Sequence, residues 1–352
     1  MPIRIGIVGA GVIGRMRAAS VRANPATVLV AVADPDLAAA QRVAGAGATA
    51  VATLDQLWDT PLDAVIVSSP VQFHADACVA ALSRGLHVLV EKPITNSVAS
   101  AEAVVAAAKE SGRVLAVGFN LRYFPAMAFV RRTIDDGTIG DLVHVRLFGG
   151  HDGLANFRAE WQYRAPESGG GATMDIGIHL SDLARFFLGD ITEVYGVASE
   201  QVWQVPGSED DAIAVLRSPS GVAARYHATW DEWEGYRLVV EAYGTLGMVR
   251  GSYGPMRNLL ITHERPGAPR RTQRKWYPEV MLREKFRSWE TTTQLAFAEE
   301  LRDFVARIEG HPGGWLADGH DGLRAVQVAA AVRQSSATRE AVHLPPLGRL
   351  GG

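Results

Sequence analysis

Three side chains have the chemistry to handle protons and negative charge: Lys92, Asp175 and His179. Lys92 follows the apolar run 86–90 within Glu91-Lys92-Pro93. A lysine at the carboxyl end of a strand reaches into the crevice where open α/β sheets bind their ligands. There a compact cation would hydrogen-bond a substrate hydroxyl and favour its deprotonation. The alternative is an ordinary surface lysine at a strand end.

Asp175 and His179 are four residues apart and follow the glycine run 169–171. On a helix beginning near Ala172 they would share one face. A histidine beside a carboxylate is a candidate general base near neutral pH. The alternative is a pair that only braces the helix against the core.

A G-x-G-x-x-G motif lies upstream, between an expected strand and an expected helix, where a pyrophosphate would be bound. Asp34 ends the second expected strand, twenty residues after the motif, where its carboxylate would accept hydrogen bonds from an adenosine ribose. Asp34 and Asp36 would repel a 2′-phosphate, so we predict NAD in preference to NADP. The residues expected to bind the cofactor here are Gly9, Gly11, Val12, Ile13, Gly14 and Asp34. A glycine turn followed by an acidic loop is the alternative.

The elements that must position these residues divide the chain in two. Before residue 120, nearly continuous apolar strands alternate with helices, which predicts an α/β Rossmann domain with a doubly wound parallel sheet. Afterwards, strand-like runs at 141–149, 191–203, 212–218, 221–230 and 236–243 follow one another with few helices between them. That pattern predicts an α+β domain with a large, mostly antiparallel open sheet. We expect a cofactor domain at 1–120 and a substrate-binding and oligomerisation domain at 121–352, with a surface loop at 265–274.

Composition excludes several classes of partner. With 352 residues, 47% of them hydrophobic, and a net charge of −3, the chain is typical of a two-domain globular protein. The charge gives no reason to expect nucleic acid or an anionic membrane, and no apolar run is long enough for a membrane span. The single cysteine, Cys78, fits a reducing cytoplasm. No cluster of His, Cys or carboxylates has metal-ligand spacing, so no metal is expected.

The ordered set of motifs resembles the Gfo/Idh/MocA family, which includes glucose–fructose oxidoreductase and inositol dehydrogenases. The resemblance rests on the glycine loop, Ser69-Pro70 with His74, Glu91-Lys92-Pro93, Gly118-Phe119-Asn120, and the segment from Gly169 to His179. It implies an NAD(P)-dependent oxidoreductase acting on a secondary alcohol of a sugar, cyclitol or related polyol. A homodimer or homotetramer formed through the open sheet is implied as well.

The resemblance also implies roles for individual residues. His179 would take the alcohol proton, Asp175 would hold the substrate or orient that base, and Lys92 would stabilise the alkoxide. The Lys92-Pro93 bond is similar to one that is often cis in the family. The further cofactor-binding residues implied are Ser69, Pro70, Gln72, His74, Glu91, Lys92 and Asn120, with Gln72 standing where relatives often have Asn. The substrate-binding residues expected besides the catalytic three are Arg122, His151 and Trp161; His151 could instead be a solvated loop histidine, and Trp161 a buried support for the sheet.

Two other functions remain open for the same fold. One is an NAD-dependent glycoside hydrolase that works through transient oxidation, and the other is a non-catalytic, NAD-binding regulatory protein. The presence of lysine, aspartate and histidine together favours the dehydrogenase.

Overall fold

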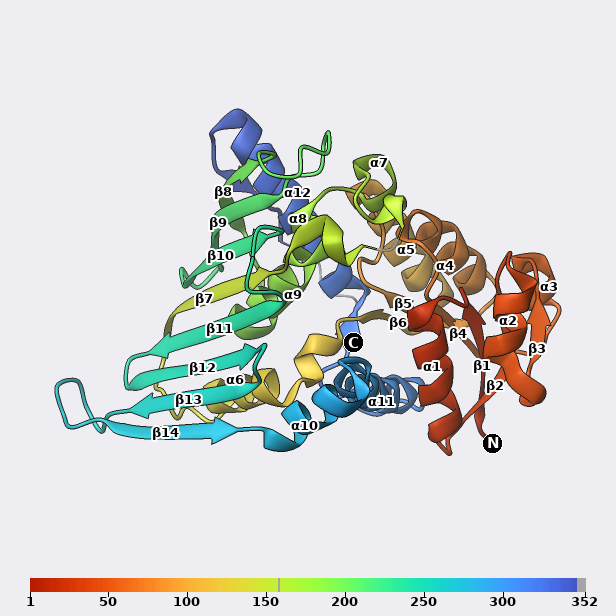
Figure 1. The fold of residues 1–352 in the computed structure, drawn as a ribbon, viewed down its shortest axis with the longest axis horizontal. Coiled ribbons are helices and arrows are strands. Elements are labelled where there is room, and N and C mark those ends of the chain that lie inside the picture. The colour runs from red at the N-terminus through yellow and green to blue at the C-terminus, as the bar shows by residue number, and fades with distance from the viewer. Residues whose placement is uncertain (158, 347–352) are drawn as a thin grey trace. The chain divides into compact units, whose positions relative to one another are not determined.

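The computed structural model describes residues 1–157 and 159–346 (Figure 1). These form two compact units, the first made of residues 1–120 and 289–323, and the second of 121–288 and the described residues from 324 onward. The expected functional division at residue 120 stays a prediction. The compact units differ from it in one stretch, 289–323, which belongs with the first unit, and residues 347–352 lie outside the described part.

The first unit is built on a parallel sheet with the strand order β15-β6-β5-β4-β1-β2-β3, in which only β15 is antiparallel to its neighbour. The order reverses between β1 and β4, and such a switch point is where doubly wound sheets bind ligands beyond the carboxyl ends of their strands. The strands are β1 (Ile3–Val8), β2 (Thr27–Ala33), β3 (Thr49–Val51), β4 (Ala64–Val67), β5 (His87–Glu91), β6 (Leu115–Gly118) and β15 (Ala317–Asp318).

Burial explains why these strands are apolar along their whole length. All four residues of β4 are buried, as expected for a strand covered on both faces. The helices of the unit are α1 (Val12–Ala23), α2 (Leu37–Ala44), α3 (Leu54–Trp58), α4 (His74–Ser83), α5 (Val98–Ser111) and α11 (Glu290–Ile308). From α11, Leu301 and Phe304 enter the same hydrophobic core as Ile5 and Ile7 of β1. The stretch 289–323 is therefore part of the core of this unit.

The second unit holds a nine-stranded sheet with the order β14-β13-β12-β11-β7-β10-β9-β8-β16. Its pairs are antiparallel except for β7 and β10, so the prediction of a mostly antiparallel sheet is confirmed. The strands are β7 (Leu142–Gly150), β8 (Glu193–Ser199), β9 (Asp211–Arg217), β10 (Ala223–Thr229), β11 (Arg237–Gly244), β12 (Gly247–Tyr253), β13 (Arg257–Thr262), β14 (Arg271–Trp276) and β16 (Val342–His343). Part of the predicted loop at 265–274 is thus strand β14, which pairs with β13.

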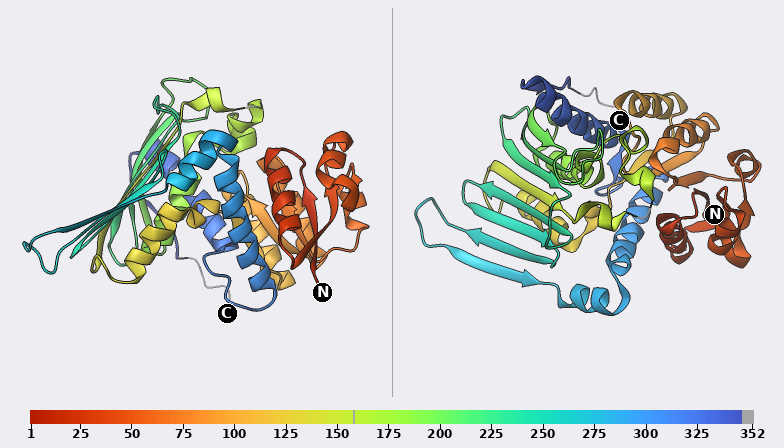
Figure 2. Two further views of the ribbon diagram at one scale, coloured as in Figure 1. Left: turned by 60° about the horizontal axis from the view of Figure 1, so that its bottom comes forward. Right: turned by 45° about the horizontal axis from the view of Figure 1, so that its top comes forward.

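Helices of the second unit pack on one face of this sheet, which Figure 2 (left) shows nearly edge on. They include α6 (Pro125–Asp135), α8 (Ala172–Asp175), α9 (Gly177–Leu188) and the later part of α12 (Gly319–Thr338). Along β9, buried and more accessible residues alternate, as expected for a sheet with one covered face. The other face carries accessible apolar side chains on β8 and β9.

Candidate active site

The glycine loop follows β1, and its glycines meet different requirements. Gly9 has a φ of 96°, and a Cβ there would lie 2.7 Å from the backbone of Ser68. At Gly14 a Cβ would come 2.0 Å from the carbonyl oxygen of Gly9, so α1 packs this closely only with glycine. At Gly11, by contrast, a Cβ would meet no described atom within 4 Å. This open space is what a pyrophosphate approaching the backbone needs.

The first turn of α1 offers backbone donors for such an anion. Gly11 stands at the N-cap, provides no side-chain cap, and no acidic residue occupies the first turn. The N–H groups at the start of a helix have no partner within it, so those of Val12 and Ile13 are suited to bind phosphate oxygens.

Asp34 stands beside this loop, immediately after β2. Its two carboxylate oxygens accept hydrogen bonds from the backbone N–H of Ala10 (2.7 Å) and of Asp36 (2.8 Å). Asp36 in turn caps α2 by accepting from the N–H of Ala39. The carboxylate is therefore held in one orientation next to the nucleotide loop, as a ribose-binding group should be.

Further polar groups lie beyond β4. The side-chain oxygens of Ser68, Ser69 and Gln72 are buried and have no hydrogen-bond partner within the described residues. Buried polar atoms are normally satisfied, so a bound ligand is a natural source of their partners. Together with the space at Gly11, these atoms fit a dinucleotide cofactor.

His74 links two loops of this edge. One ring nitrogen lies 2.8 Å from the carbonyl oxygen of Ser69 and the other 2.9 Å from that of Pro93. The side chain is buried, and burial lowers its pKa. With both nitrogens facing the backbone, His74 joins the loop after β4 to the loop after β5. Its predicted contact with the cofactor stays a prediction.

Glu91 ends β5 on the same edge and Lys92 follows it, and the Lys92-Pro93 bond is cis, as expected. Glu91 is bound by Arg17 of α1 at 2.6 Å, and the same guanidinium lies 2.6 Å from Glu300 of α11. Arg17 is only 1% exposed and stacks on Phe297. Burial alone would lower the pKa of Arg17, but the attraction of its two carboxylates outweighs it and the pKa is raised. The residue before the candidate catalytic lysine is thus held by a buried ion cluster.

Asn120 follows β6, which pairs in parallel with β5. Since the carboxyl ends of parallel strands meet at one edge, the structure of the first unit gathers every predicted cofactor-binding residue of the chain there.

In the second unit, the Asp175 carboxylate is bound by two side chains. Each of them comes directly after one of two neighbouring parallel strands, β7 and β10. The register pairs Gly150 of β7 with Thr229 of β10, so His151 and Trp230 leave the sheet side by side. His151 Nε2 lies 2.7 Å from the Asp175 carboxylate, and the Trp230 indole N–H donates to the same oxygen at 3.2 Å. The N–H of Gly153 donates to His151 Nδ1, so the proton of the neutral ring is on Nε2 and points to Asp175.

His151 is therefore not a solvated loop histidine, because it is only 6% exposed. Tyr236 lies parallel to it at a ring distance of 6.4 Å. Desolvation of the Tyr236 hydroxyl and then the charge of Asp175 raise the pKa of that hydroxyl, although the residue as a whole is 41% exposed. Asp175 stands at the centre of this polar and aromatic group.

His179 lies in the first turn of α9 and is buried. The expected single helix is instead two, α8 ending at Asp175 and α9 beginning at Gly177, with Ile176 between them in helical conformation. The N–H of His179 bonds to the carbonyl oxygen of Ile176, one residue nearer than in a regular α-helix. A Cβ at Gly177 would lie 1.9 Å from the Tyr226 hydroxyl, which explains a glycine at this junction.

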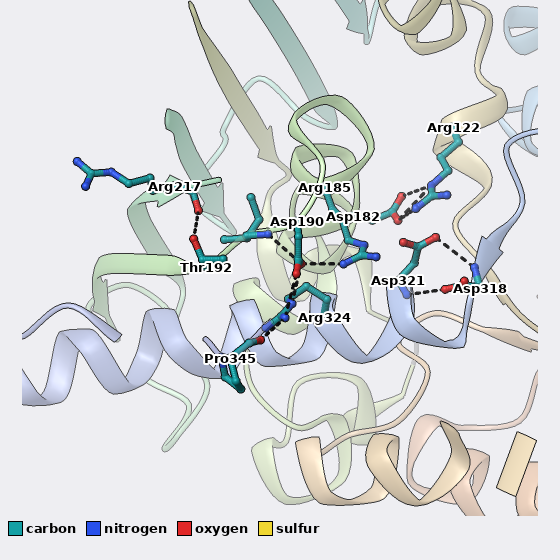
Figure 3. Close-up of polar contacts among 11 residues, drawn as sticks. Arg122, Asp182, Arg185, Asp190, Thr192, Arg217, Asp318, Asp321, Arg324 and Pro345 are labelled. Atoms are coloured by element: carbon teal, nitrogen blue, oxygen red, sulfur yellow. Dashed lines mark hydrogen bonds and ion pairs between the residues drawn. The ribbon is translucent and has the colours of Figure 1, made fainter. Parts of the chain in front are cut away.

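Arg122 and Trp161, two of the predicted substrate-binding residues, lie in short 3₁₀ turns. Arg122, in the 3₁₀ turn Asn120–Tyr123, is 4% exposed, and its Nε donates to both Asp182 oxygens at 3.0 and 3.1 Å (Figure 3). Its guanidinium thus ties this turn to α9. Trp161 is half-buried in the short 3₁₀ turn Glu160–Gln162. Their contacts with substrate stay predictions.

Two residues that contact predicted site residues had no sequence signal of their own. Trp230 ended an expected strand, and no prediction was made for Arg17. Among the described residues there is no group of three His, Cys, Asp or Glu side chains that could hold a metal ion. In the same part of the chain, no helix is long and apolar enough to cross a membrane.

Comparison with known proteins places both units. Residues 3–119 match a family profile described as an oxidoreductase family with an NAD-binding Rossmann fold, and residues 127–250 match the GFO/IDH/MocA C-terminal domain. An inositol 2-dehydrogenase of Rhizobium meliloti (strain 1021) is 31% identical over 97% of this chain and 99% of that protein. A scyllo-inositol 2-dehydrogenase (NAD(+)) of Bacillus subtilis (strain 168) is 31% identical over 70% of this chain and 73% of that protein. A levoglucosan dehydrogenase in complex with NADH shares the fold, with a TM-score of 0.85 at 22% identity over 99% of this chain and 100% of that chain.

Proposed function

Because this chain belongs to the Gfo/Idh/MocA family of oxidoreductases, we propose that it transfers hydride between NAD and a secondary alcohol of a sugar, cyclitol or related polyol. The observation that carries the proposal is the place of Lys92. It follows β5 on the sheet edge that also holds the glycine loop and Asp34. The names of the relatives, inositol 2-dehydrogenase among them, support polyols as the substrate class.

NAD, when bound, supplies the acceptor for the hydride, and the residues of the chain manage the proton and the charge. His179 takes the hydroxyl proton on a ring nitrogen as general base. The Lys92 ammonium stabilises the negative charge that develops on the substrate oxygen. Asp175, whose carboxylate accepts the N–H groups of His151 and Trp230, holds a substrate hydroxyl or orients the base.

A panel assay tests this function directly. The purified protein is mixed with NAD and a series of cyclitols, aldoses and sugar acids, and absorbance of reduced nicotinamide is followed. We expect reduction of NAD with at least one polyol. A glycoside hydrolase would instead release free sugar from a glycoside without net NADH, and a regulatory protein would bind NAD and turn over nothing. Either of these results would contradict the proposal.

Replacement of Asp34 by alanine tests the preference for NAD. A hydrogen bond to a charged group contributes about 1.5–3 kcal/mol, so the Kd for NAD should rise roughly tenfold to hundredfold. The Kd for NADP should rise less or fall, because the repulsion of the 2′-phosphate is relieved. Titration calorimetry with both cofactors measures the ratio, and Asp55→Ala, an exposed carboxylate of the same unit, is the control. Equal changes for both cofactors would contradict the assignment.

Replacement of His179 by asparagine tests the general base. At neutral pH we expect kcat to fall on the order of 10²-fold, because proton transfer by a positioned base is lost. Activity should recover partly as pH rises, since hydroxide then removes the proton. The measurement is the pH profile of kcat, with the exposed His343→Asn as control. A wild-type profile in the His179 variant would rule out this role.

We further propose that two copies associate through the open face of the second unit's sheet. Exposed apolar residues lie side by side on the neighbouring strands β8 and β9, where Tyr195 pairs with Val215 and Val197 with Ile213. All four are about half exposed or more. Apolar side chains gathered on one surface mark an interaction site. We place the protein in a reducing cytoplasm because its single cysteine, Cys78, is buried and free.

A further inference from the structure

Glu209, between β8 and β9, accepts the first N–H groups of α8. Its carboxylate Oε1 receives the N–H of Gly171 (3.2 Å), the N–H of Thr173 (3.0 Å) and the Thr173 hydroxyl. Its backbone carbonyl receives the N–H of Ala172 at 2.7 Å. The initial N–H groups of a helix have no partner within it, so this one residue caps α8 through three consecutive amides. Asp175 ends that helix.

The fit around Glu209 is close, and its charge is balanced. A Cβ on Gly171 would lie 2.1 Å from the Glu209 carbonyl oxygen, which accounts for one glycine of the run 169–171. Glu209 is 3% exposed, and Arg333 of α12 lies 3.8 Å from its carboxylate. Arg333 also donates to the Thr173 hydroxyl oxygen at 2.7 Å. A buried carboxylate with this set of donors has little freedom to move.

The next residue, Asp210, fixes the other side of the same site. Its backbone carbonyl accepts the N–H of Trp230 at 2.7 Å, and Trp230 donates its indole N–H to Asp175. Its carboxylate accepts the N–H groups of Val202 and Trp203 at 2.7 and 3.0 Å, which hold the β8–β9 connection in place. Glu209 thus sets the start of the helix that carries Asp175, and Asp210 sets a donor to its carboxylate.

We infer that Glu209 is a positioning residue for Asp175: it fixes α8 so that the carboxylate meets its two N–H donors. The inference rests on the proposed function only for its effect on catalysis. Glu209 itself contacts backbone amides, the Thr173 hydroxyl and Arg333, so its removal should reduce turnover through the placement of Asp175. A misplacement of about 1 Å at a reacting group costs on the order of 10²-fold in rate.

The test compares Glu209→Ala with Glu209→Gln. The alanine variant removes the side-chain cap of α8 and leaves only the backbone carbonyl of residue 209 as acceptor. It should lower kcat on the order of 10²-fold while the Kd for NAD stays within about twofold. The glutamine variant keeps one acceptor oxygen for the amides and should retain kcat within about fivefold. If glutamine restores kcat, the role of Glu209 is to place the helix, because glutamine keeps an acceptor oxygen but carries no negative charge. If the alanine variant does not fold, Thr173→Val, which removes one donor and leaves the amides bound, should lower kcat about tenfold.

Asp190→Ala is the matched control. Asp190 is also ion-paired, to Arg185 and Arg324, and accepts the N–H of Ile191, but it lies beyond the far end of α9 (Figure 3). This variant should lose thermal stability to a similar degree and keep kcat within about threefold. Equal losses of kcat in Glu209→Ala and Asp190→Ala would overturn the inference.

Amide hydrogen exchange decides the inference independently of turnover. The segment 171–175 should exchange faster in Glu209→Ala than in wild type or Asp190→Ala, because the carboxylate that accepts the N–H groups of Gly171 and Thr173 is gone. Unchanged exchange in that segment would overturn the inference. A wild-type protein that reduces no NAD with any polyol would overturn the proposed function, whereas the exchange result would still stand for the position of α8.

Discussion

Replacing Lys92 by alanine is expected to lower kcat/KM on the order of 10³-fold. Removal of one donor that stabilises an oxyanion costs about 10²–10³-fold in other enzymes, and here the donor also carries the only charge we assign to that role. The Kd for NAD should stay within about twofold, since the glycine loop and Asp34 remain. Steady-state kinetics with the best polyol of the panel, together with a cofactor titration, measure both quantities.

Lys109→Ala is the control, because Lys109 is an exposed lysine of α5 in the same unit. It should leave both quantities unchanged. Lys92→Arg should recover little activity, since a planar guanidinium does not replace a compact ammonium. Surviving turnover in Lys92→Ala would refute the mechanism. Equal losses of turnover and NAD binding would make Lys92 a cofactor ligand rather than a catalytic residue.

Replacing Arg17 by methionine is expected to lower the free energy of unfolding by about 3–5 kcal/mol, as when one partner of a buried ion pair is removed. Arg17 is the partner of both Glu91 and Glu300, and the side chains of Arg17 and Glu300 are each 1% exposed. Methionine fills much of the same space on Phe297 but leaves the two carboxylates facing each other in the core. Urea unfolding monitored by circular dichroism gives the change.

Two further variants make this result specific. Arg15→Met removes another ion pair between α1 and α11, that of Arg15 with Glu290, but Arg15 is 56% exposed. Its loss should be about 1 kcal/mol or less. Adding Glu300→Gln to Arg17→Met should restore part of the stability, because one uncompensated charge is removed. Additive effects of Arg17→Met and Glu300→Gln would show that the cluster does not act as a unit.

The first unit could be predicted from sequence in most respects. Continuous apolar strands, the glycine loop and the spacing to Asp34 depend on neighbours in the chain, and the structure confirms a doubly wound parallel sheet. The contribution of α11 could not be foreseen, because nothing in an amphipathic helix says which sheet it covers. Strand β14 was also not predicted, and its first residues were assigned to a surface loop. An edge strand that is exposed at every residue has no alternation of apolar and polar side chains by which it could be recognised.

The functional roles of the candidate site residues stay predictions, but the contacts around them can be compared with what the sequence suggested. Helical spacing placed Asp175 with His179, and the structure adds His151 and Trp230 as donors to the Asp175 carboxylate. Those two residues meet because β7 and β10 are parallel in a sheet that is otherwise antiparallel, and they are almost eighty positions apart in the chain. The pairing of β7 with β10 depends on the order of strands in the sheet, and the local sequence pattern of a strand does not reveal which strand will lie beside it.

The late return of 289–323 to the first unit has a consequence for how the protein is made. A ribosome releases residues 1–120 long before Leu301 and Phe304, which complete the core around β1, and before β15, which covers the edge of β6. At about 5–20 residues per second, the interval is on the order of 10–40 s. During that time Arg17 is without Glu300. The core of the first unit must therefore stay incomplete while the whole of the nine-stranded sheet except its last short strand is synthesised. It is completed only when residues 289–323 emerge.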